Sequence, residues 1–296
     1  MGKASLDRCD AQRFSLNFGI KRPLHQRGRF DLRAIAPRVF AVQLFRPNPP
    51  VDRDEFEWLL ACFAWLRSVL EDAHIRPEFV MPQHPSIREA QTASELFDAV
   101  RSLAGMQDWA CRLEKVDTRV DVPDLQLIEG AGACGTFSVE NGEAVIRYSA
   151  DMLKLPDNLA ATFAHELCHY LLMDAGDPPG GPEMMEHSTD CAAIYLGFGV
   201  LLSNAAKHFE HTVDIGGMGW RSWNAGYLSE EARVTATAMF AALHRYELDA
   251  AYEALKPHLR KSLKKAARVI ANEHSDYSTS LEQVDLLDWN FAKDRV

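Results

Sequence analysis

The chain of 296 residues has few cysteines and no long apolar run. Its cysteines form no Cys-x-x-Cys pair and lie far apart, at Cys9, Cys62, Cys111, Cys134, Cys168 and Cys191. This spacing excludes a zinc knuckle and a small disulfide framework, and it is typical of reduced thiols in a cytosol. The longest apolar run, from Cys191 to Leu202, is shorter than the about 20 residues that cross a bilayer. No apolar signal core follows the first charged residues, so we expect a cytoplasmic protein with no membrane partner.

The chain has no overall excess of positive charge, which argues against non-specific binding to nucleic acid. Its net charge is −10, but the charge is uneven. Residues 1–38 contain nine basic and three acidic side chains, so this segment carries +6 and the remainder −16. The segment is either a solvated arm or an arm that contacts an acidic partner. With 47% apolar and 25% charged residues, the composition is otherwise that of an ordinary globular protein.

One predicted helix combines apolar residues with three ionisable side chains. The segment from Leu159 to Asp174 reads LAATFAHELCHYLLMD and contains the pattern His-Glu-x-x-His. Because a helix advances about 100° per residue, His165 and His169 lie one turn apart on one side, where two imidazoles can hold a divalent ion, usually Zn2+. Glu166 lies to one side of this pair and is placed to take a proton from a metal-bound water. A buried helix has no packing reason to carry such polar groups, which favours a metal site over hydrogen-bonded core histidines.

A catalytic zinc site has three protein ligands and one open position, so a third ligand must come from elsewhere. A third histidine on the same motif is excluded, because the chain has Leu and Ala where that longer pattern requires Gly and His. After a loop rich in Gly and Pro, a second helix is predicted to begin at Glu183 and to bring an acidic ligand. We predict Glu186 as this ligand, with Glu183 and His187 as its rivals. Asp190 lies within an apolar run four residues later and is predicted to orient a ligand histidine.

The pattern His-Glu-x-x-His, followed by a short loop and a helix with Glu-x-x-x-Asp, resembles the compact gluzincin metallopeptidases, which include the HtpX-type proteases and the smaller ImmA/IrrE-type proteins. The resemblance covers roughly residues 125–205, under a third of the chain. It implies an α+β fold with a zincin-like core, in which a small, mostly antiparallel sheet accompanies the metal-binding helices, and with additional helical regions. It also implies that His165, His169 and Glu186 bind zinc and that Glu166 is the general base. This chain has Cys168 between the ligands, where the family often has a small residue.

A β-hairpin is predicted shortly before the metal-binding helix. Asn141 and Gly142 separate two segments of β-forming residues, and Asn-Gly suits a tight type I′ turn. In zincins generally, the strand before the metal-binding helix pairs with an extended peptide. By this resemblance, and by the general logic of strand addition, Val145 to Ser149 is the candidate edge of the cleft. The alternative is an ordinary exposed edge strand.

The chain is predicted to divide into four parts. Residues 1–38 are the basic N-terminal arm, and residues 39–105 are a mostly helical region. In this region an apolar stripe runs from Asp52 to Ala73, and Thr92 and Glu95 form a capping box for another helix. Residues 106–275 are the zincin-like catalytic domain, and residues 276–296 are a tail with a short helix.

These observations predict a Zn2+-dependent peptidase that hydrolyses a peptide or protein substrate. Glu166 takes a proton as the activated water attacks the peptide carbonyl, and then passes it to the departing amine. The transition state also requires a hydrogen-bond donor beside the metal. The candidates for this donor are Tyr227, Arg233, His208 and Tyr195. Two alternatives stay open: a hydrolase of a non-peptide amide, and a metal-containing sensor or binding protein with a catalytically silent zincin fold, which a fourth ligand such as His187 would favour.

Overall fold

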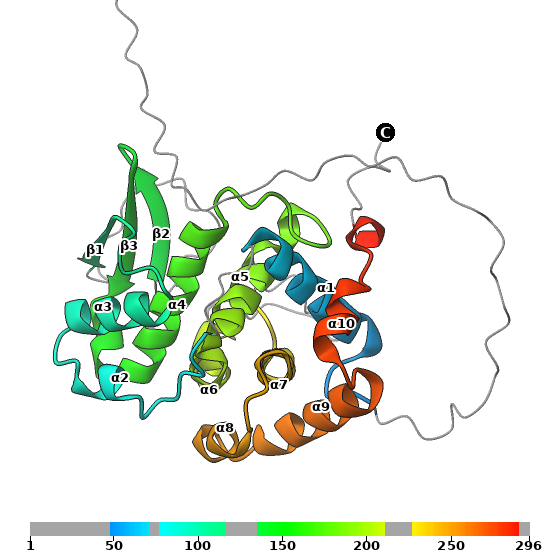
Figure 1. Cartoon of the computed structure of the whole chain (residues 1–296). Helices are drawn as coiled ribbons and strands as arrows, with labels where there is room; N and C mark the ends of the chain where they lie inside the picture. Colours follow the sequence, from blue (N-terminus) through cyan, green and yellow to red (C-terminus); the bar gives the residue numbers. More distant parts are fainter. Residues whose placement is uncertain (1–47, 71–76, 117–134, 211–226, 290–296) are drawn as a thin grey trace, which may run out of the picture.

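The computed structural model describes residues 48–70, 77–116, 135–210 and 227–289, apart from the side chains of residues 206–210. This part of the chain is a mixed α+β structure with a small sheet at one end of a helical body (Figure 1), which confirms the predicted class. The predicted basic arm, residues 1–38, lies outside the described residues. The main elements are α1 (Arg53–Val69), α2 (Pro85–Glu89), α3 (Ala93–Leu103), β1 (Cys111–Val116), β2 (Gly135–Glu140), β3 (Glu143–Ser149), α4 (Pro156–Leu172), α5 (Met185–Ala193), α6 (Gly199–Glu210), α7 (Glu230–His244), α8 (Asp249–Ala254), α9 (Arg260–Glu273) and α10 (Tyr277–Glu282).

The described sheet has the strand order β1-β3-β2 and contains one parallel and one antiparallel pair. β2 and β3 form the predicted hairpin, and Asn141 and Gly142 have φ angles of 52° and 82°, as a type I′ turn requires. The prediction of a mostly antiparallel sheet is wrong, because β1 pairs with β3 in parallel. This pairing makes β3 the central strand, so Val145 to Ser149 does not form the expected edge. β2 forms an edge of the sheet instead, and the local sequence contains no signal for the long-range pairing that causes the difference.

α4 covers one face of the sheet, with β2 lying beside it (Figure 1). The helix begins at Pro156, at a position where the missing N–H of proline costs no helical hydrogen bond. Its buried face packs on neighbouring elements through Phe163, whose ring centroid lies 5.2 Å from that of Phe97 and 5.6 Å from that of Tyr148. These contacts fix the rotation of α4 about its axis. The polar residues of the helix are therefore held at defined positions relative to β2.

The helix that was expected to run on from Glu183 is interrupted in the structure. A short 3₁₀ turn at Pro182–Met184 precedes α5, and the chain leaves helical geometry at Gly197, whose φ is +101°. A Cβ atom at Gly197 would collide with the carbonyl oxygen of Glu78, and the Gly197 carbonyl accepts a 3.0 Å hydrogen bond from the N–H of Val80. Only glycine combines this φ angle with so close an approach of another backbone segment. The break therefore depends on tertiary packing, which helical periodicity does not reveal.

One hydrophobic core includes residues of both the predicted N-terminal helical region and the predicted catalytic region. α1 begins after Asp52, whose side chain caps it, and packs against α5, α7 and α10. The indole N–H of Trp58 donates a 2.8 Å hydrogen bond to the carbonyl of Pro179, in the loop before α5. The capping box at Thr92 is also confirmed. The helix α1 thus packs against both α5 and the loop that precedes it.

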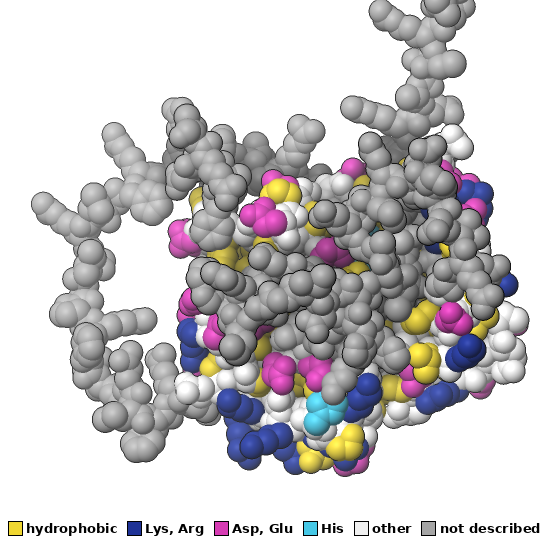
Figure 2. Space-filling model, turned by 180° about the vertical axis from the view of Figure 1, so that it is seen from behind, with side chains coloured by type: hydrophobic (Ala, Val, Ile, Leu, Met, Phe, Trp, Pro, Cys, Tyr) yellow, Lys and Arg dark blue, Asp and Glu magenta, His cyan; other side chains and the backbone are white. Residues whose placement is uncertain are grey.

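The C-terminal helices complete the body of the molecule. Ser229 caps α7, with its hydroxyl accepting a hydrogen bond from the N–H of Ala232. α9 carries exposed basic side chains, and Figure 2 shows Lys and Arg gathered at the lower edge of the molecule, where this helix lies. α10 is the helix within the predicted tail. Over the ranges that the structure describes, no helix is both long enough and apolar enough to cross a membrane.

Candidate metal centre

His165 and His169 lie on successive turns of α4, and their Nε2 atoms are 3.1 Å apart. Glu186, in the first turn of α5, reaches both rings. Its Oε2 atom lies 3.3 Å from Nε2 of His165 and 3.4 Å from Nε2 of His169. Within the described residues, these three side chains form the group whose atoms can hold a metal ion. α4 and α5 therefore bring together the two imidazoles and the carboxylate that the sequence pattern predicts as ligands.

The separations between these ligand atoms fit one small cation. In a tetrahedral zinc site the bonds to nitrogen and oxygen are about 2.0–2.1 Å long, which places neighbouring ligand atoms about 3.3 Å apart. The three observed separations of 3.1, 3.3 and 3.4 Å match this edge length. Calcium requires six or more oxygen ligands, whereas two imidazoles and one carboxylate suit zinc. Both the size of the site and its donor atoms therefore fit a zinc ion.

The rival ligands lie outside this group. Glu183 is exposed on the 3₁₀ turn that precedes α5. His187 is 4% exposed, and its ring meets that of Trp58 edge-on, with the centroids 6.1 Å apart. Because consecutive helical residues lie about 100° apart, His187 faces α1 while Glu186 faces α4. In the part of the chain that the structure describes, no fourth protein ligand joins the group.

Asp190, which is predicted to orient a ligand histidine, contacts His165. Its Oδ1 atom lies 3.0 Å from Nδ1 of His165. Burial raises the pKa of Asp190, but the charge of Arg233 together with hydrogen bonds from His165 and the N–H of Leu228 outweighs burial and lowers the pKa, so the carboxylate is an ionised acceptor. An ionised carboxylate only accepts hydrogen bonds, so Nδ1 of His165 donates to it and Nε2 is the nitrogen that faces the centre. The carboxylate thus fixes the direction of the imidazole ring.

Arg233 does not have the predicted role of a donor beside the metal. It is fully buried, and its Nε and Nη2 atoms donate to Oδ2 of Asp190 at 3.1 and 2.9 Å. Its Nη1 atom donates to the carbonyl of Leu202 at 3.1 Å. The guanidinium therefore lies behind Asp190 and supports His165 indirectly. The sequence does carry a signal for this role, because an Arg among the alanines and apolar residues of α7 requires a buried anionic partner.

The charges around the centre favour a cation at the point where the ligand atoms meet. Burial alone lowers the pKa of His165, but hydrogen bonds to Asp190 and Glu186 outweigh it and raise the pKa to about 10. Burial raises the pKa of Glu186, but its hydrogen bonds with the two histidines outweigh burial and hold the pKa well below the usual range. The side chain of Glu186 is 38% exposed and that of His169 is 19% exposed, so the centre reaches solvent on this side.

Glu166 lies beside the centre and under β2. Its side chain is 5% exposed, and burial raises its pKa despite the nearby histidines. The backbone N–H of Phe137 faces this carboxylate and offsets part of the effect of burial on its pKa. β2 approaches α4 closely, because a Cβ atom on Gly135 would lie 3.1 Å from Cγ of Glu166 and 2.5 Å from Cγ2 of Thr162. The roles of Gly135 and Phe137 were not predicted, since they depend on how β2 sits on α4.

The remaining donor candidates differ in their distance from the centre. The ring of Tyr227 packs on that of His165, with a centroid distance of 5.4 Å. Burial, followed by the charges of Glu186, Glu166 and Asp190, raises the pKa of Tyr227, so its hydroxyl stays protonated. Tyr195 instead packs against Phe63 and His244 in the helical body. The side chain of His208 lies outside the described residues. Tyr227 therefore remains the candidate donor with a position beside the ligands.

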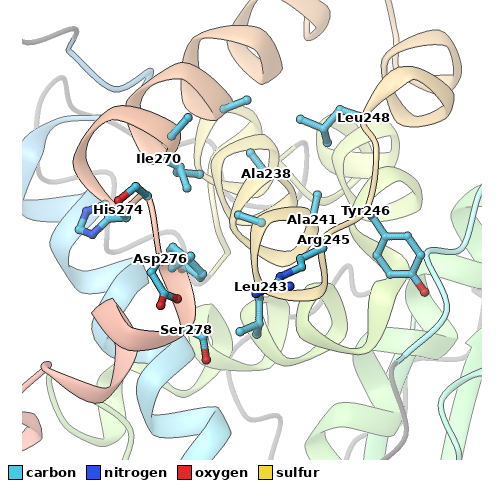
Figure 3. A pocket seen from close by; sticks show the side chains of 15 residues that line it. Ala238, Ala241, Leu243, Arg245, Tyr246, Leu248, Ile270, His274, Asp276 and Ser278 are labelled. Carbon is cyan, nitrogen blue, oxygen red and sulfur yellow. The ribbon is translucent and has the colours of Figure 1, made fainter.

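A separate cavity of about 520 Å³ lies between α7, α9 and α10 (Figure 3). Its lining includes Ala238, Ile270, Arg245 and Asp276, but none of the three candidate ligands. The cavity is thus distinct from the candidate metal centre, which lies between α4 and α5. The candidate site is therefore defined by the side chains of His165, His169 and Glu186, and this cavity is not part of it.

Comparisons of this chain with protein-family models, with curated proteins and with solved structures found no match.

Proposed function

We propose that this protein is a zinc-dependent peptidase with a zincin-like centre. One observation carries the proposal: the ligand atoms of His165, His169 and Glu186 converge at the spacing of a tetrahedral site. The described residues offer three protein ligands, and three ligands with an open position are the arrangement of catalytic zinc. A structural or sensory site would instead fill the fourth position with another side chain. The arrangement therefore favours the enzyme over the sensor.

A divalent ion bound by these three side chains would polarise a water molecule and the scissile carbonyl. Glu166 then acts as the general base. Its carboxylate removes a proton from the attacking water and delivers that proton to the nitrogen of the departing amine. Burial raises the pKa of Glu166, and a raised pKa suits a carboxyl group that both accepts and returns a proton near neutral pH. Asp190 keeps His165 in place throughout, and Tyr227 is the candidate donor to the oxyanion.

An extended peptide is the substrate form that the surroundings favour. β2 is an edge strand of the described sheet and lies directly over Glu166. The free edge of a strand offers backbone N–H and C=O groups that pair with an extended segment. This feature gives peptide hydrolysis support that hydrolysis of a small non-peptide amide does not share. The proposed substrate-binding edge is therefore β2, in place of the predicted edge on β3.

The proton-transfer role is tested by Glu166→Gln. The variant should bind one zinc ion per chain, as the wild type does, because Glu166 is not a ligand. Hydrolysis of an unfolded protein substrate should fall by about 10²- to 10⁴-fold. The measurements are zinc content by atomic emission and cleavage followed by mass spectrometry. Full activity in this variant would exclude Glu166 as the base.

The ligand assignment is tested by a matched pair of substitutions in the same short segment. Glu186→Gln should lose most of its bound zinc and its activity, whereas Glu183→Gln should retain both, since Glu183 is exposed outside the cluster. His165→Ala should also lose the metal. Undiminished zinc in Glu186→Gln, or a loss in Glu183→Gln alone, would contradict the assignment.

A further inference from the structure

An apolar surface adjoins the proposed catalytic centre along β2 and the end of α4. Successive residues of a strand point to opposite faces, so Phe137 and Val139 share the face of β2 that packs on α4. The ring of Phe137 stacks on those of His169 and Tyr170, with centroid distances of 6.4 and 5.7 Å and interplanar angles of 8° and 23°. Phe137 therefore contacts both the candidate ligand His169 and the neighbouring aromatic side chain of Tyr170.

The same surface continues away from the centre. Met173 lies one turn beyond His169, and so on the same side of α4. The step from Phe137 to Val139 along the strand is about 6.8 Å long, and the step from His169 to Met173 along the helix is about 6 Å long. Because the two steps are nearly equal, we expect Val139 to lie beside Met173 as Phe137 lies beside His169. β2 and α4 run side by side in this direction (Figure 1). Val139 is 49% exposed and Met173 is 51% exposed, although both are apolar.

The apolar shelf consists of Phe137, Val139, Tyr170 and Met173. Resting on the proposed peptidase function, we propose that this shelf binds a large apolar side chain of the substrate, aromatic or aliphatic, on one side of the bond that is cleaved. The occupant is a peptide because the shelf is continuous with two features that act on peptides. One feature is the proposed catalytic centre, which includes His169, and the other is the edge of β2 that pairs with no other strand of the described residues.

The direction of the backbone groups of β2 supports this assignment. In an antiparallel pair, alternate residues direct their N–H and C=O groups toward the partner strand and away from it. Glu140 pairs with Glu143 across the two-residue turn, so Glu140 and Ser138 direct their backbone groups toward β3, and Phe137 directs its own away from β3. Val139, two residues later, directs its backbone groups the same way. A peptide that paired with this edge would hold its backbone beside Val139 and place a side chain over the shelf.

Peptide binding to the Glu166→Gln protein loaded with zinc tests the proposal without requiring hydrolysis. The probes are two fluorescent peptides of about ten Gly and Ser residues, one with Phe at its centre and one with Ser. Burial of a Phe side chain is large enough for the Phe peptide to bind about ten-fold tighter or more. Met173→Asp and Val139→Asp should each remove this preference. Leu153→Asp is the control. Leu153 is similarly exposed, at 48%, but it precedes the N-terminus of α4, whereas the shelf lies at the C-terminus of this helix.

The outcomes separate this proposal from the proposed function. Equal affinity for the two peptides, or a preference that survives both shelf substitutions at unchanged zinc content, would overturn the shelf. Dimerisation that Met173→Asp abolishes, with no peptide preference, would assign the shelf to a second copy of the chain and would also overturn it. An intact preference in a wild-type protein that cleaves neither peptides nor proteins would support the shelf and contradict the peptidase.

Discussion

Removal of the guanidinium behind Asp190 should weaken both the fold and the metal centre. In Arg233→Met the buried carboxylate would lose two hydrogen bonds, of 2.9 and 3.1 Å, from a partner whose side chain is 1% exposed. Loss of one member of a buried ion pair typically costs about 3–5 kcal/mol, because the other charge stays buried without compensation. For a chain of this size, that cost corresponds to a fall in melting temperature of about 10 °C. Disturbance of a group that orients a ligand histidine should lower zinc affinity by about 10- to 100-fold.

Thermal unfolding of the metal-free protein measures the first effect, and competition with a zinc chelator measures the second. Arg88→Met is the control, because Arg88 pairs with Asp157 across 3.7 Å at a site where both side chains are more than a third exposed. Such a pair is worth about 0–1 kcal/mol. If Arg233→Met were as stable as Arg88→Met and bound zinc as tightly as the wild type, the supporting role of Arg233 would be refuted. A variant that bound zinc normally but lost its turnover would restore Arg233 as a direct donor.

Three further predictions concern the metal, the strand contact and pH. Addition of zinc at about 100 times its dissociation constant should stabilise the metal-free protein by about 2.7 kcal/mol; an unchanged melting temperature would contradict a specific site. Gly135→Ala should lower the free energy of unfolding by about 1–3 kcal/mol and reduce activity, because the new Cβ would meet Cγ2 of Thr162 at 2.5 Å. The control is Gly105→Ala, whose new Cβ would meet nothing within 4 Å. It should lower the free energy of unfolding by about 1 kcal/mol because of the positive φ at this position, and it should keep its activity. Burial and then nearby carboxylates raise the pKa of Glu55 from 4.5 to about 7, so its contribution to stability is complete below pH 4.5 and is lost as the pH rises through 7. Glu55→Gln should therefore be more stable than the wild type at pH 8, by about 1 kcal/mol after allowance for partial exposure, but not at pH 4.5; denaturant unfolding at the two pH values decides this.

The local parts of the centre could be predicted from the sequence. Two histidines four residues apart on an apolar helix share a side by helical geometry alone, which made His165 and His169 predictable. Asp190 was predictable because a carboxylate inside an apolar run needs a buried partner. The Asn-Gly turn likewise specified the hairpin. In each case the relevant interaction either lies within a few residues of sequence or follows from the cost of burying a charge.

The other features depend on contacts between distant segments. The parallel pairing of β1 with β3, which makes β2 an edge strand, joins segments about 30 residues apart and has no local signature. The break at Gly197 arises from the approach of Glu78, on a different part of the chain. Arg233 was predicted as a donor beside the metal, but its partner is Asp190, and this pairing depends on the packing of α7 against α5. Sequence periodicity identifies such side chains without revealing which group they meet.

The most direct test of the proposed centre is a crystal structure of the zinc-loaded protein, with diffraction data recorded on both sides of the zinc absorption edge. The account predicts one anomalous peak about 2.0–2.1 Å from Nε2 of His165, from Nε2 of His169 and from a carboxylate oxygen of Glu186, with a non-protein ligand in the fourth position. A peak that excludes Glu186, or one whose fourth ligand is another side chain of this chain, would contradict it.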